Sequence, residues 1–327
     1  MAIHMFQQLI DTLKKSPKKI VFTEGTDARI LEASARLLSG TFLTPVLVGN
    51  PEEIQAAAEE AGFNIRGAEI VDPETYPDMD KMVDTMVELR KGKMTADECR
   101  AALKKSNYFG TMLVKMGVAD CLLGGATYST ADTVRPALQL VKTKPGNKIV
   151  SSCFIMVREG VGENTVLAMG DCAINIKPTE DELVEITTEV AHCARIFGID
   201  PKVAMLSYST KGSGKGEDVD KMRNAYEKVL ATNPDFDVDG ELQFDAAVSP
   251  KVGQLKSPGS PVAGYANTFI FPDINAGNIG YKIAQRLGNF DAYGPILLGL
   301  NAPINDLSRG CNAQEVYSMA IITAALA

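Results

Sequence analysis

Histidine is scarce in this chain of 327 residues, which contains only His4 and His192. Neither belongs to an H-x-x-x-H or H-E-x-x-H pattern, the spacings that place zinc ligands on one face of a helix. The six cysteines are scattered and form no C-x-x-C pair. We therefore expect reduced thiols, a cytoplasmic location and no metal site.

An excess of positive charge is also missing. Asp and Glu number 41 against 33 Lys and Arg, which gives a formal charge of -8. This balance argues against partners such as nucleic acid or an anionic membrane. No apolar run approaches membrane-spanning length, and the spacing of apolar residues from Ile3 to Leu13 predicts an amphipathic helix rather than a signal peptide. We expect a soluble protein that holds any anionic ligand with local arginines and helix N-termini.

Three common signatures of phosphate binding or nucleophilic catalysis are absent. The loop Lys211–Gly216 is glycine-rich, but Ser209 and Gly216 stand where a Walker loop needs a glycine and a hydroxyl. We interpret it as a flexible surface loop. No G-x-G-x-x-G follows the apolar run Lys19–Gly25, which argues against a nicotinamide dehydrogenase. The G-x-S-x-G pattern of serine hydrolases is missing too.

Apolar runs alternate with helical patterns in the first third of the chain. We expect strands at three positions: Lys19–Gly25, Thr44–Asn50 and Val118–Gly125. Helical patterns fill the sequence between them: Asp27–Leu38, Pro51–Glu60 and the charged region Met79–Lys105. This alternation with short links predicts a parallel α/β sheet.

The polar, turn-forming cluster Lys142–Lys148 predicts a domain boundary. Beyond it, Ile149–Val157 and Thr165–Cys172 predict two strands of a hairpin joined by a Gly-rich turn, and a capping box at Thr179–Glu182 opens a helix to Phe197. The remaining elements expected there are strands at Val203–Ser209, Glu241–Val248 and Asn267–Pro272, and helices at Val219–Leu230 and from Asp273 to Leu287.

The length exceeds the roughly 250–300 residues at which a single core stops growing, so we expect two domains. Residues 1–146 together with 293–327 are expected to form a first α/β domain. Residues 147–292 are expected to form a second α/β domain inserted into it.

The segment from Tyr293 to Met319 carries the most concentrated chemistry. Pro295–Leu300 predicts a buried strand, a loop then leads to Ser308 and Arg309, and the last helix begins near Glu315. Loops beyond strand C-termini are where α/β proteins place active sites, and a guanidinium suits phosphates and developing oxyanions. Glu315 has two interpretations, a catalytic carboxylate or the second half of a capping box opened by Asn312. A carboxylate bound to backbone amides is a weaker base.

Two further features are ambiguous. The run Gly124–Ser129 suits either close packing of a helix on a strand end or a cradle of amides and hydroxyls for an anion. Arginines are few, 11 against 22 lysines. Arg90 closes a helical pattern, Arg286 lies late in another, and Arg135 precedes Pro136 in what we expect to be the first turn of a helix.

Five motifs occur in one order: Thr23–Ile30, Asn107–Met112, Gly124–Ser129 with Thr133–Pro136, Phe271–Asn278 and Asn305–Cys311. Together they closely resemble the phosphate acetyltransferase (phosphotransacetylase) family from about Lys19 to the end of the chain. The resemblance implies an isocitrate-dehydrogenase-like fold of two α/β domains with largely parallel sheets, a substrate cleft between them, and a homodimer. It also implies reversible acetyl transfer between coenzyme A (CoA) and phosphate, by direct attack of the CoA thiolate in a ternary complex.

Carried over residue by residue, the resemblance implies that Ser308 and Arg309 stabilise charge in the reaction. The general base of the family is usually an aspartate, where this chain has Glu315, which is one methylene longer. Binding of CoA or phosphate is implied for a further set of residues: Arg90, Ser129, Arg135, Asn275, Asn278, Arg286 and Tyr293. CoA is a substrate in this scheme, and no tightly bound cofactor is implied.

Alternative functions remain open at this point. A phosphate butyryltransferase differs only in acyl chain length. A non-catalytic module that binds acetyl-CoA for regulation, like a domain of some malic enzymes, would not need Ser308, Arg309 and an acid together. An isocitrate-dehydrogenase-like metal enzyme is a weaker third possibility.

Overall fold

The computed structural model describes residues 2–159 and 165–327 of the chain. The Gly-rich turn expected between the two hairpin strands lies outside these residues. The chain forms two compact units, each considered separately below. The terminal unit comprises Phe6–Pro145 with Leu300–Ala327, and the central unit comprises Gly146–Gly299 with the first described residues of the chain, up to Met5.

A five-stranded parallel sheet forms the centre of the terminal unit, with strand order β11-β4-β1-β2-β3. Its strands are β1 Lys18–Phe22, β2 Leu43–Val48, β3 Glu69–Val71, β4 Cys121–Gly124 and β11 Ile304–Asp306. All four residues of β4 are buried, as expected for a central strand covered on both faces.

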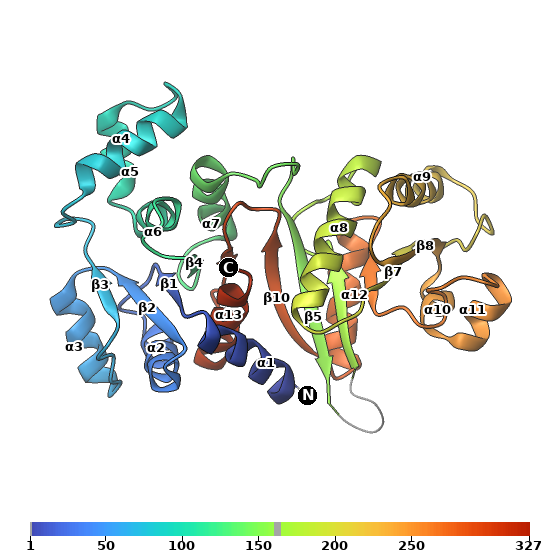
Figure 1. Ribbon diagram of the computed structural model, residues 1–327, viewed down its shortest axis with the longest axis horizontal. Helices are drawn as coiled ribbons and strands as arrows, with labels where there is room; N and C mark the ends of the chain where they lie inside the picture. The colour runs from blue at the N-terminus through green and yellow to red at the C-terminus, as the bar shows by residue number, and fades with distance from the viewer. Residues whose placement is uncertain (1, 160–164) are drawn as a thin grey trace. The chain divides into compact units, whose positions relative to one another are not determined.

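Helices cover both faces of this sheet, with α2 and α13 on one side and α6 on the other (Figure 1). Its helical segments are α1 Ala2–Lys15, α2 Ala28–Gly40, α3 Pro51–Ala61, α4 Met79–Arg90, α5 Ala96–Leu103, α6 Ser106–Lys115, α7 Thr130–Pro136, the π-helical turn η1 Ala137–Val141, and α13 Ala313–Ala325. Val21, Phe109 and Leu122 are fully or almost fully buried between the sheet and α6. Burying large apolar side chains of this kind contributes about 1.5–3 kcal/mol each.

The central unit contains a mixed sheet with strand order β10-β5-β6-β9-β7-β8. Its strands are β5 Ser151–Arg158, β6 Thr165–Gly170, β7 Lys202–Leu206, β8 Asp237–Leu242, β9 Thr268–Ile270 and β10 Asp291–Leu298. β5 pairs antiparallel with β10 and β6, and the other pairings are parallel. The two predicted hairpin strands therefore do pair.

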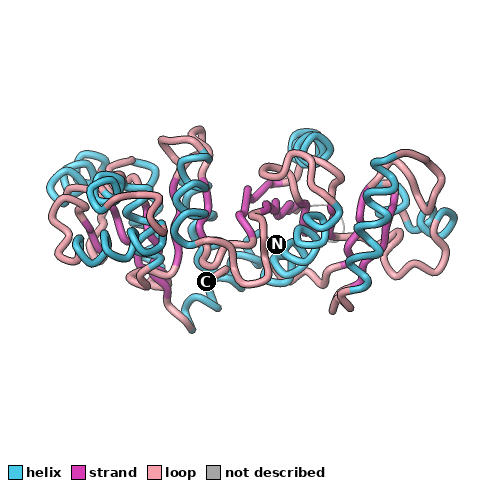
Figure 2. Tube along the Cα trace, turned by 90° about the horizontal axis from the view of Figure 1, so that it is seen from above, coloured by secondary structure: helices cyan, strands magenta, loops and turns pink. Residues whose placement is uncertain are grey.

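The helices of the central unit are α8 Glu180–Ile196, α9 Glu217–Ala231, α10 Phe244–Val248, α11 Pro250–Lys256 and α12 Ile274–Leu287. Figure 2 shows the strands of each unit flanked by helices. The capping box predicted at the start of α8 is confirmed, because Thr179 and Glu182 each accept a hydrogen bond from the other's main-chain N–H. Local side-chain chemistry thus determines where this helix begins.

Two expectations about strands need correction. The strand near Tyr293, which we assigned with the C-terminal segment, is β10 and pairs with β5, so the central unit extends to Gly299. The strand expected at Glu241–Val248 ends at Leu242, and Phe244–Val248 is α10 instead. The alternation of acidic and apolar residues in Asp237–Leu242 concealed β8, because Asp239 and Glu241 are buried with ion-pair partners.

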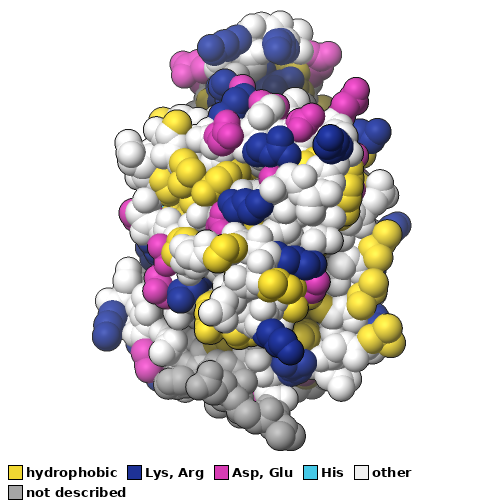
Figure 3. Space-filling model, turned by 90° about the vertical axis from the view of Figure 1, so that its right-hand side faces the viewer, with side chains coloured by type: hydrophobic (Ala, Val, Ile, Leu, Met, Phe, Trp, Pro, Cys, Tyr) yellow, Lys and Arg dark blue, Asp and Glu magenta, His cyan; other side chains and the backbone are white. Residues whose placement is uncertain are grey.

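The charged region Met79–Lys105 is helical but divided. Its two helices, α4 and α5, are separated by a turn in which Lys91 adopts a positive φ of 48° and Thr95 caps α5. In the part of the chain that the structure describes, no helix is both long and apolar enough to cross a membrane. The surface near α9, α10 and α11 shows several small hydrophobic patches with lysines and arginines between them (Figure 3).

Candidate active site

The turn that carries Ser308 and Arg309 follows β11 at the edge of the parallel sheet. Asp306 is in register with Gly124 of β4, and the Leu307 N–H donates to the Gly124 carbonyl at 2.7 Å. The turn closes through a 2.9 Å hydrogen bond from the Cys311 N–H to the Ser308 carbonyl. Because β11 and β4 are parallel, the loops after their carboxyl ends emerge at the same edge of the sheet.

Both side chains predicted to stabilise charge are exposed on this turn. The Ser308 hydroxyl accepts a 3.2 Å hydrogen bond from the Gly310 N–H, which fixes the direction of the side chain. The Arg309 guanidinium makes no hydrogen bond or ion pair with any residue that the structure describes. Its five donors are therefore available to an anion.

Arg29 holds this turn in place from the start of α2. Its Nη1 donates to the main-chain carbonyls of Arg309 (2.9 Å) and Cys311 (3.1 Å), and its Nη2 donates to the carbonyl of Ala126 (3.0 Å). Asp27 caps α2 and pairs with Arg29 at 2.7 Å, and this hydrogen bond lowers the pKa of the Asp27 carboxyl. One guanidinium thus joins the segments that follow β1, β4 and β11.

Glu315 lies in the first turn of α13 and completes a capping box. Its main-chain N–H donates to Asn312 Oδ1 at 2.9 Å, and its carboxylate accepts from the Asn312 N–H at 3.0 Å. The predicted capping box is therefore confirmed. The Glu315 side chain is nevertheless exposed, so one carboxylate oxygen bonds to the backbone while the residue faces solvent.

Hydrogen bonds to Glu24 hold the loop after β4, Gly124–Ser129, in place. The Glu24 carboxylate accepts from the main-chain N–H groups of Gly125 (2.9 Å) and Thr127 (3.3 Å). The Thr23 hydroxyl bonds both to Glu24 (2.8 Å) and to the Tyr128 hydroxyl (2.8 Å). Burial raises the pKa of the Glu24 carboxyl above its ordinary value.

A second buried carboxylate, Asp306, secures the start of α7. It accepts hydrogen bonds from the hydroxyls of Thr130 (2.6 Å) and Thr133 (2.5 Å). Burial raises the pKa of Asp306, since the two hydroxyls only partly replace its hydration. These threonines belong to α7, so Asp306 connects that helix to the turn carrying Ser308.

The other predicted binding residues of the terminal unit are spread over two helices. Ser129 precedes α7 and donates to Asp132 at 2.7 Å. Arg135 is exposed in the last turn of α7, not in a first turn as we expected, because the helix begins at Thr130 and Pro136 is its final residue. Arg90 ends α4, and its buried Nε has no hydrogen-bond partner among the described residues.

Four predicted residues belong to the central unit. Asn275, Asn278 and Arg286 share α12, and their spacing puts them on neighbouring parts of one helix face. Asn278 donates to the Cys172 carbonyl at 3.1 Å, whereas Asn275 and Arg286 are exposed. Tyr293 lies on β10, and burial raises its pKa to about 12.

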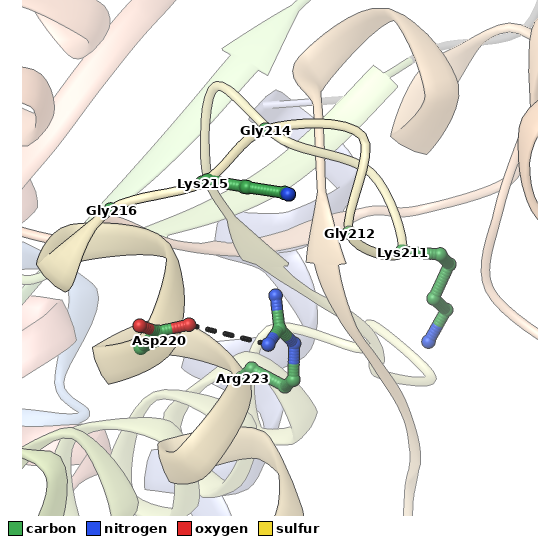
Figure 4. Close-up of a pocket in the computed structure, with 7 residues that line it drawn as sticks. All are labelled: Lys211, Gly212, Gly214, Lys215, Gly216, Asp220 and Arg223. Atoms are coloured by element: carbon green, nitrogen blue, oxygen red, sulfur yellow. Dashed lines mark hydrogen bonds and ion pairs between the residues drawn. The ribbon is translucent and has the colours of Figure 1, made fainter.

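The glycine-rich loop Lys211–Gly216 borders a cavity of about 470 Å³ in the central unit (Figure 4). Its lining residues are Lys211, Gly212, Gly214, Lys215, Gly216, Asp220 and Arg223. The Lys215 side chain extends from the loop toward Arg223. At first sight this arrangement suits an anion.

The charges around that cavity are largely neutralised by internal pairs. Lys211 bonds to the buried Asp239, and Arg223 lies 3.3 Å from Asp220 and 3.4 Å from the buried Glu241. Glu241 also accepts from the Gly212 N–H at 2.7 Å. The loop is exposed, as predicted. Its contacts with the buried carboxylates of Asp239 and Glu241 hold it in place.

Sequence patterns alone did not reveal Glu24 and Arg29. Both fall within the motif Thr23–Ile30 that follows β1, and that motif was the available signal. No group of three or more metal-ligating residues occurs in the described ranges.

Comparison with known proteins identifies the family. The family described as Phosphate acetyl/butaryl transferase matches residues 4–324. The chain belongs to this family. A phosphate acetyltransferase of Bacillus subtilis (strain 168) is 52% identical over 323 residues, covering 99% of both chains.

Solved structures of the phosphate acetyl/butaryl transferase family agree with this chain throughout. A phosphotransacetylase from Streptococcus pyogenes superposes with a TM-score of 0.95 at 54% identity, and one from Staphylococcus aureus with 0.93 at 45% identity. Each comparison covers 99% of this chain and 98% of the other. The expected phosphotransacetylase fold is therefore confirmed, and the chain is an acyltransferase of this family.

Proposed function

We propose that the chain is a phosphate acetyltransferase that transfers an acetyl group reversibly between CoA and phosphate. The observation that carries this proposal is the Ser308–Arg309 turn. The Ser308 hydroxyl is exposed there, the Arg309 guanidinium has no partner among the described residues, and Arg29 binds the main chain of the turn. The names of relatives about half identical over the whole chain support acetyl as the group transferred.

In the proposed reaction the CoA thiolate attacks the carbonyl carbon of acetyl phosphate. The new C–S bond forms, the C–O bond to phosphate breaks, and phosphate leaves with the electron pair. Negative charge grows on the acetyl oxygen, and Arg309 and Ser308 are the proposed donors to it. Loss of one such donor typically costs about 3–4 kcal/mol.

The thiol must lose its proton before or during attack, because a free thiol has a pKa of about 8.5 and is mostly protonated at neutral pH. We assign this step to Glu315, which is exposed on the same segment as Ser308 and Arg309. One carboxylate oxygen accepts the cap hydrogen bond from Asn312, and the other is the proposed proton acceptor.

Binding of CoA or phosphate is proposed for the same residues that the sequence indicated, in two groups. The terminal unit supplies Arg90, Ser129 and Arg135. The central unit supplies Asn275, Asn278, Arg286 and Tyr293. We propose CoA as a substrate and no tightly bound cofactor.

A coupled assay tests this function. Purified protein is mixed with CoA and acetyl phosphate, and thioester formation and phosphate release are measured together. Equal amounts of both products support the proposal, whereas CoA binding without turnover points to a regulatory module. Butyryl phosphate in a parallel reaction tests acyl-chain preference, and a higher kcat/KM for it would identify a butyryltransferase.

We further propose a cytoplasmic homodimer that binds neither nucleic acid nor membranes. The six cysteines are all free and buried, which fits a reducing compartment. On α12, Ile279, Ile283 and Leu287 are 57%, 53% and 80% exposed at i, i+4 and i+8, an apolar stripe suited to a second copy. Sedimentation should give a dimer for the protein and a monomer for Ile283→Lys; a monomeric wild-type protein contradicts the proposal.

A further inference from the structure

Glu24 follows β1, yet the main-chain N–H groups that it binds lie about 100 residues later in the sequence. Its Oε1 accepts from the N–H groups of Gly125 and Thr127, and its Oε2 accepts from the Thr23 hydroxyl. In the described part of the chain, no lysine or arginine forms a hydrogen bond or ion pair with it. Both oxygens already have donors, so Glu24 is poorly suited to take a proton from a substrate.

The loop that Glu24 holds has little room for any other conformation. Gly125 has a φ of +95°, and a Cβ there would lie 2.2 Å from Asp306 Oδ1. A Cβ on Gly124 would lie 2.2 Å from the Tyr128 hydroxyl and 2.3 Å from the Thr23 hydroxyl. The backbone is thus packed directly against polar side chains, which requires glycine at both positions.

Two side chains bind different parts of this loop, and a third binds the helix that follows it. Arg29 binds the Ala126 carbonyl, Asp306 binds hydroxyls at the start of α7, and Glu24 binds main-chain N–H groups. An amide left without a partner in such a partly buried position destabilises the conformation that buries it. Removing the Glu24 carboxylate would leave two amides to find new partners, and the loop would move.

We infer that Glu24 is a positioning residue for the acyl transfer: it holds Gly124–Ser129 in the conformation that receives a phosphate group of the substrate. This inference rests on the proposed function, in which Ser129 binds CoA or phosphate. Glu24 acts through the loop and does not touch the reacting atoms.

Three variants of Glu24 separate this role from general stability. Glu24→Ala removes the acceptor, and Glu24→Asp withdraws it by one methylene; both should raise KM for CoA or for the phosphate substrate by about tenfold or more while lowering kcat less. Glu24→Gln keeps an oxygen for the two amides and should restore KM to within about threefold of wild type.

The matched control is Thr323→Val, which removes a buried 2.8 Å hydrogen bond from Asn305. Asn305 and Asp306 point to opposite faces of β11, so this change affects the other side of the sheet. The control should lower Tm without changing KM. If the Ala and Asp variants of Glu24 alter KM no more than the control does, or if Gln is as damaging as Ala, the inference is wrong.

Calorimetric titration with CoA and with inorganic phosphate keeps this inference distinct from the proposed function. Weaker binding by Glu24→Ala and Glu24→Asp, with binding retained by Glu24→Gln, supports the positioning role even if wild-type protein shows no turnover. Turnover by the wild type with unchanged binding in all three variants overturns the positioning role and leaves the function intact.

Discussion

The Arg29 guanidinium donates a 2.9 Å hydrogen bond to the main-chain carbonyl of Arg309, 280 residues later in the chain. A second guanidinium nitrogen bonds to Ala126, and Asp27 holds the whole group by an ion pair. The proposed catalytic arginine is therefore positioned through its backbone by another arginine. Its own side chain stays available to an anion.

Arg29→Ala should lower kcat by about 100-fold, because a displacement of about 1 Å at a reacting group has an effect of that size. Arg36→Ala is the matched control: Arg36 lies on the same helix and bonds to Gln314 at 2.6 Å on the exposed surface. Steady-state kinetics of the two variants check the prediction. Equal, small losses of kcat would show that Arg29 does not position the turn.

Substitutions at Glu315 and Asn312 distinguish a general base from a helix cap. Glu315→Gln can still complete a capping box, so Tm should change little, while kcat should fall by about 100-fold or more if the carboxylate takes the thiol proton. Asn312→Ala should lower the free energy of unfolding by about 1 kcal/mol and retain most of kcat. A Glu315→Gln enzyme with nearly full kcat would leave Glu315 with the capping role alone.

Stability should depend on pH through the buried Asp306. Its pKa is raised in the folded protein, so the protonated carboxyl favours folding below the unfolded-state pKa of about 3.9. That contribution is lost as the pH rises through the folded-state pKa. The free energy of unfolding of Asp306→Asn, relative to that of wild type, should therefore increase from about pH 4 to neutral pH. Each tenfold difference in proton affinity between the folded and unfolded states changes it by roughly 1.4 kcal/mol. Urea denaturation of both proteins across this range measures the difference, and a constant difference would contradict it.

Elements that are determined by contacts between residues close in the chain were predictable from the sequence. The capping boxes at Thr179 and Asn312 follow from residues three positions apart, and both are present. The alternation of apolar runs and helices was sufficient to predict parallel strands in the terminal unit. Such patterns depend only on residues close in the sequence, so they can be recognised without knowing the fold.

Features that depend on distant partners were not predictable in the same way. β11 has only three residues, and two of them, Asn305 and Asp306, are polar; its pairing with β4 makes it a strand. The apolar pattern of β10 did not reveal that it pairs with β5. Glu24 falls within the expected strand Lys19–Gly25, and the sequence does not reveal its role because the amides it binds lie about 100 residues away.

The most direct test of the account compares acetyl-CoA formation by wild-type protein and by Arg309→Ala, from CoA and acetyl phosphate at saturating concentrations. Arg66→Ala, which removes an exposed arginine from a turn elsewhere in the terminal unit, is the control. We predict rapid turnover by wild type and control, and a loss of about 100- to 1,000-fold in kcat for Arg309→Ala with Tm unchanged. Turnover by Arg309→Ala within a few-fold of wild type would contradict it.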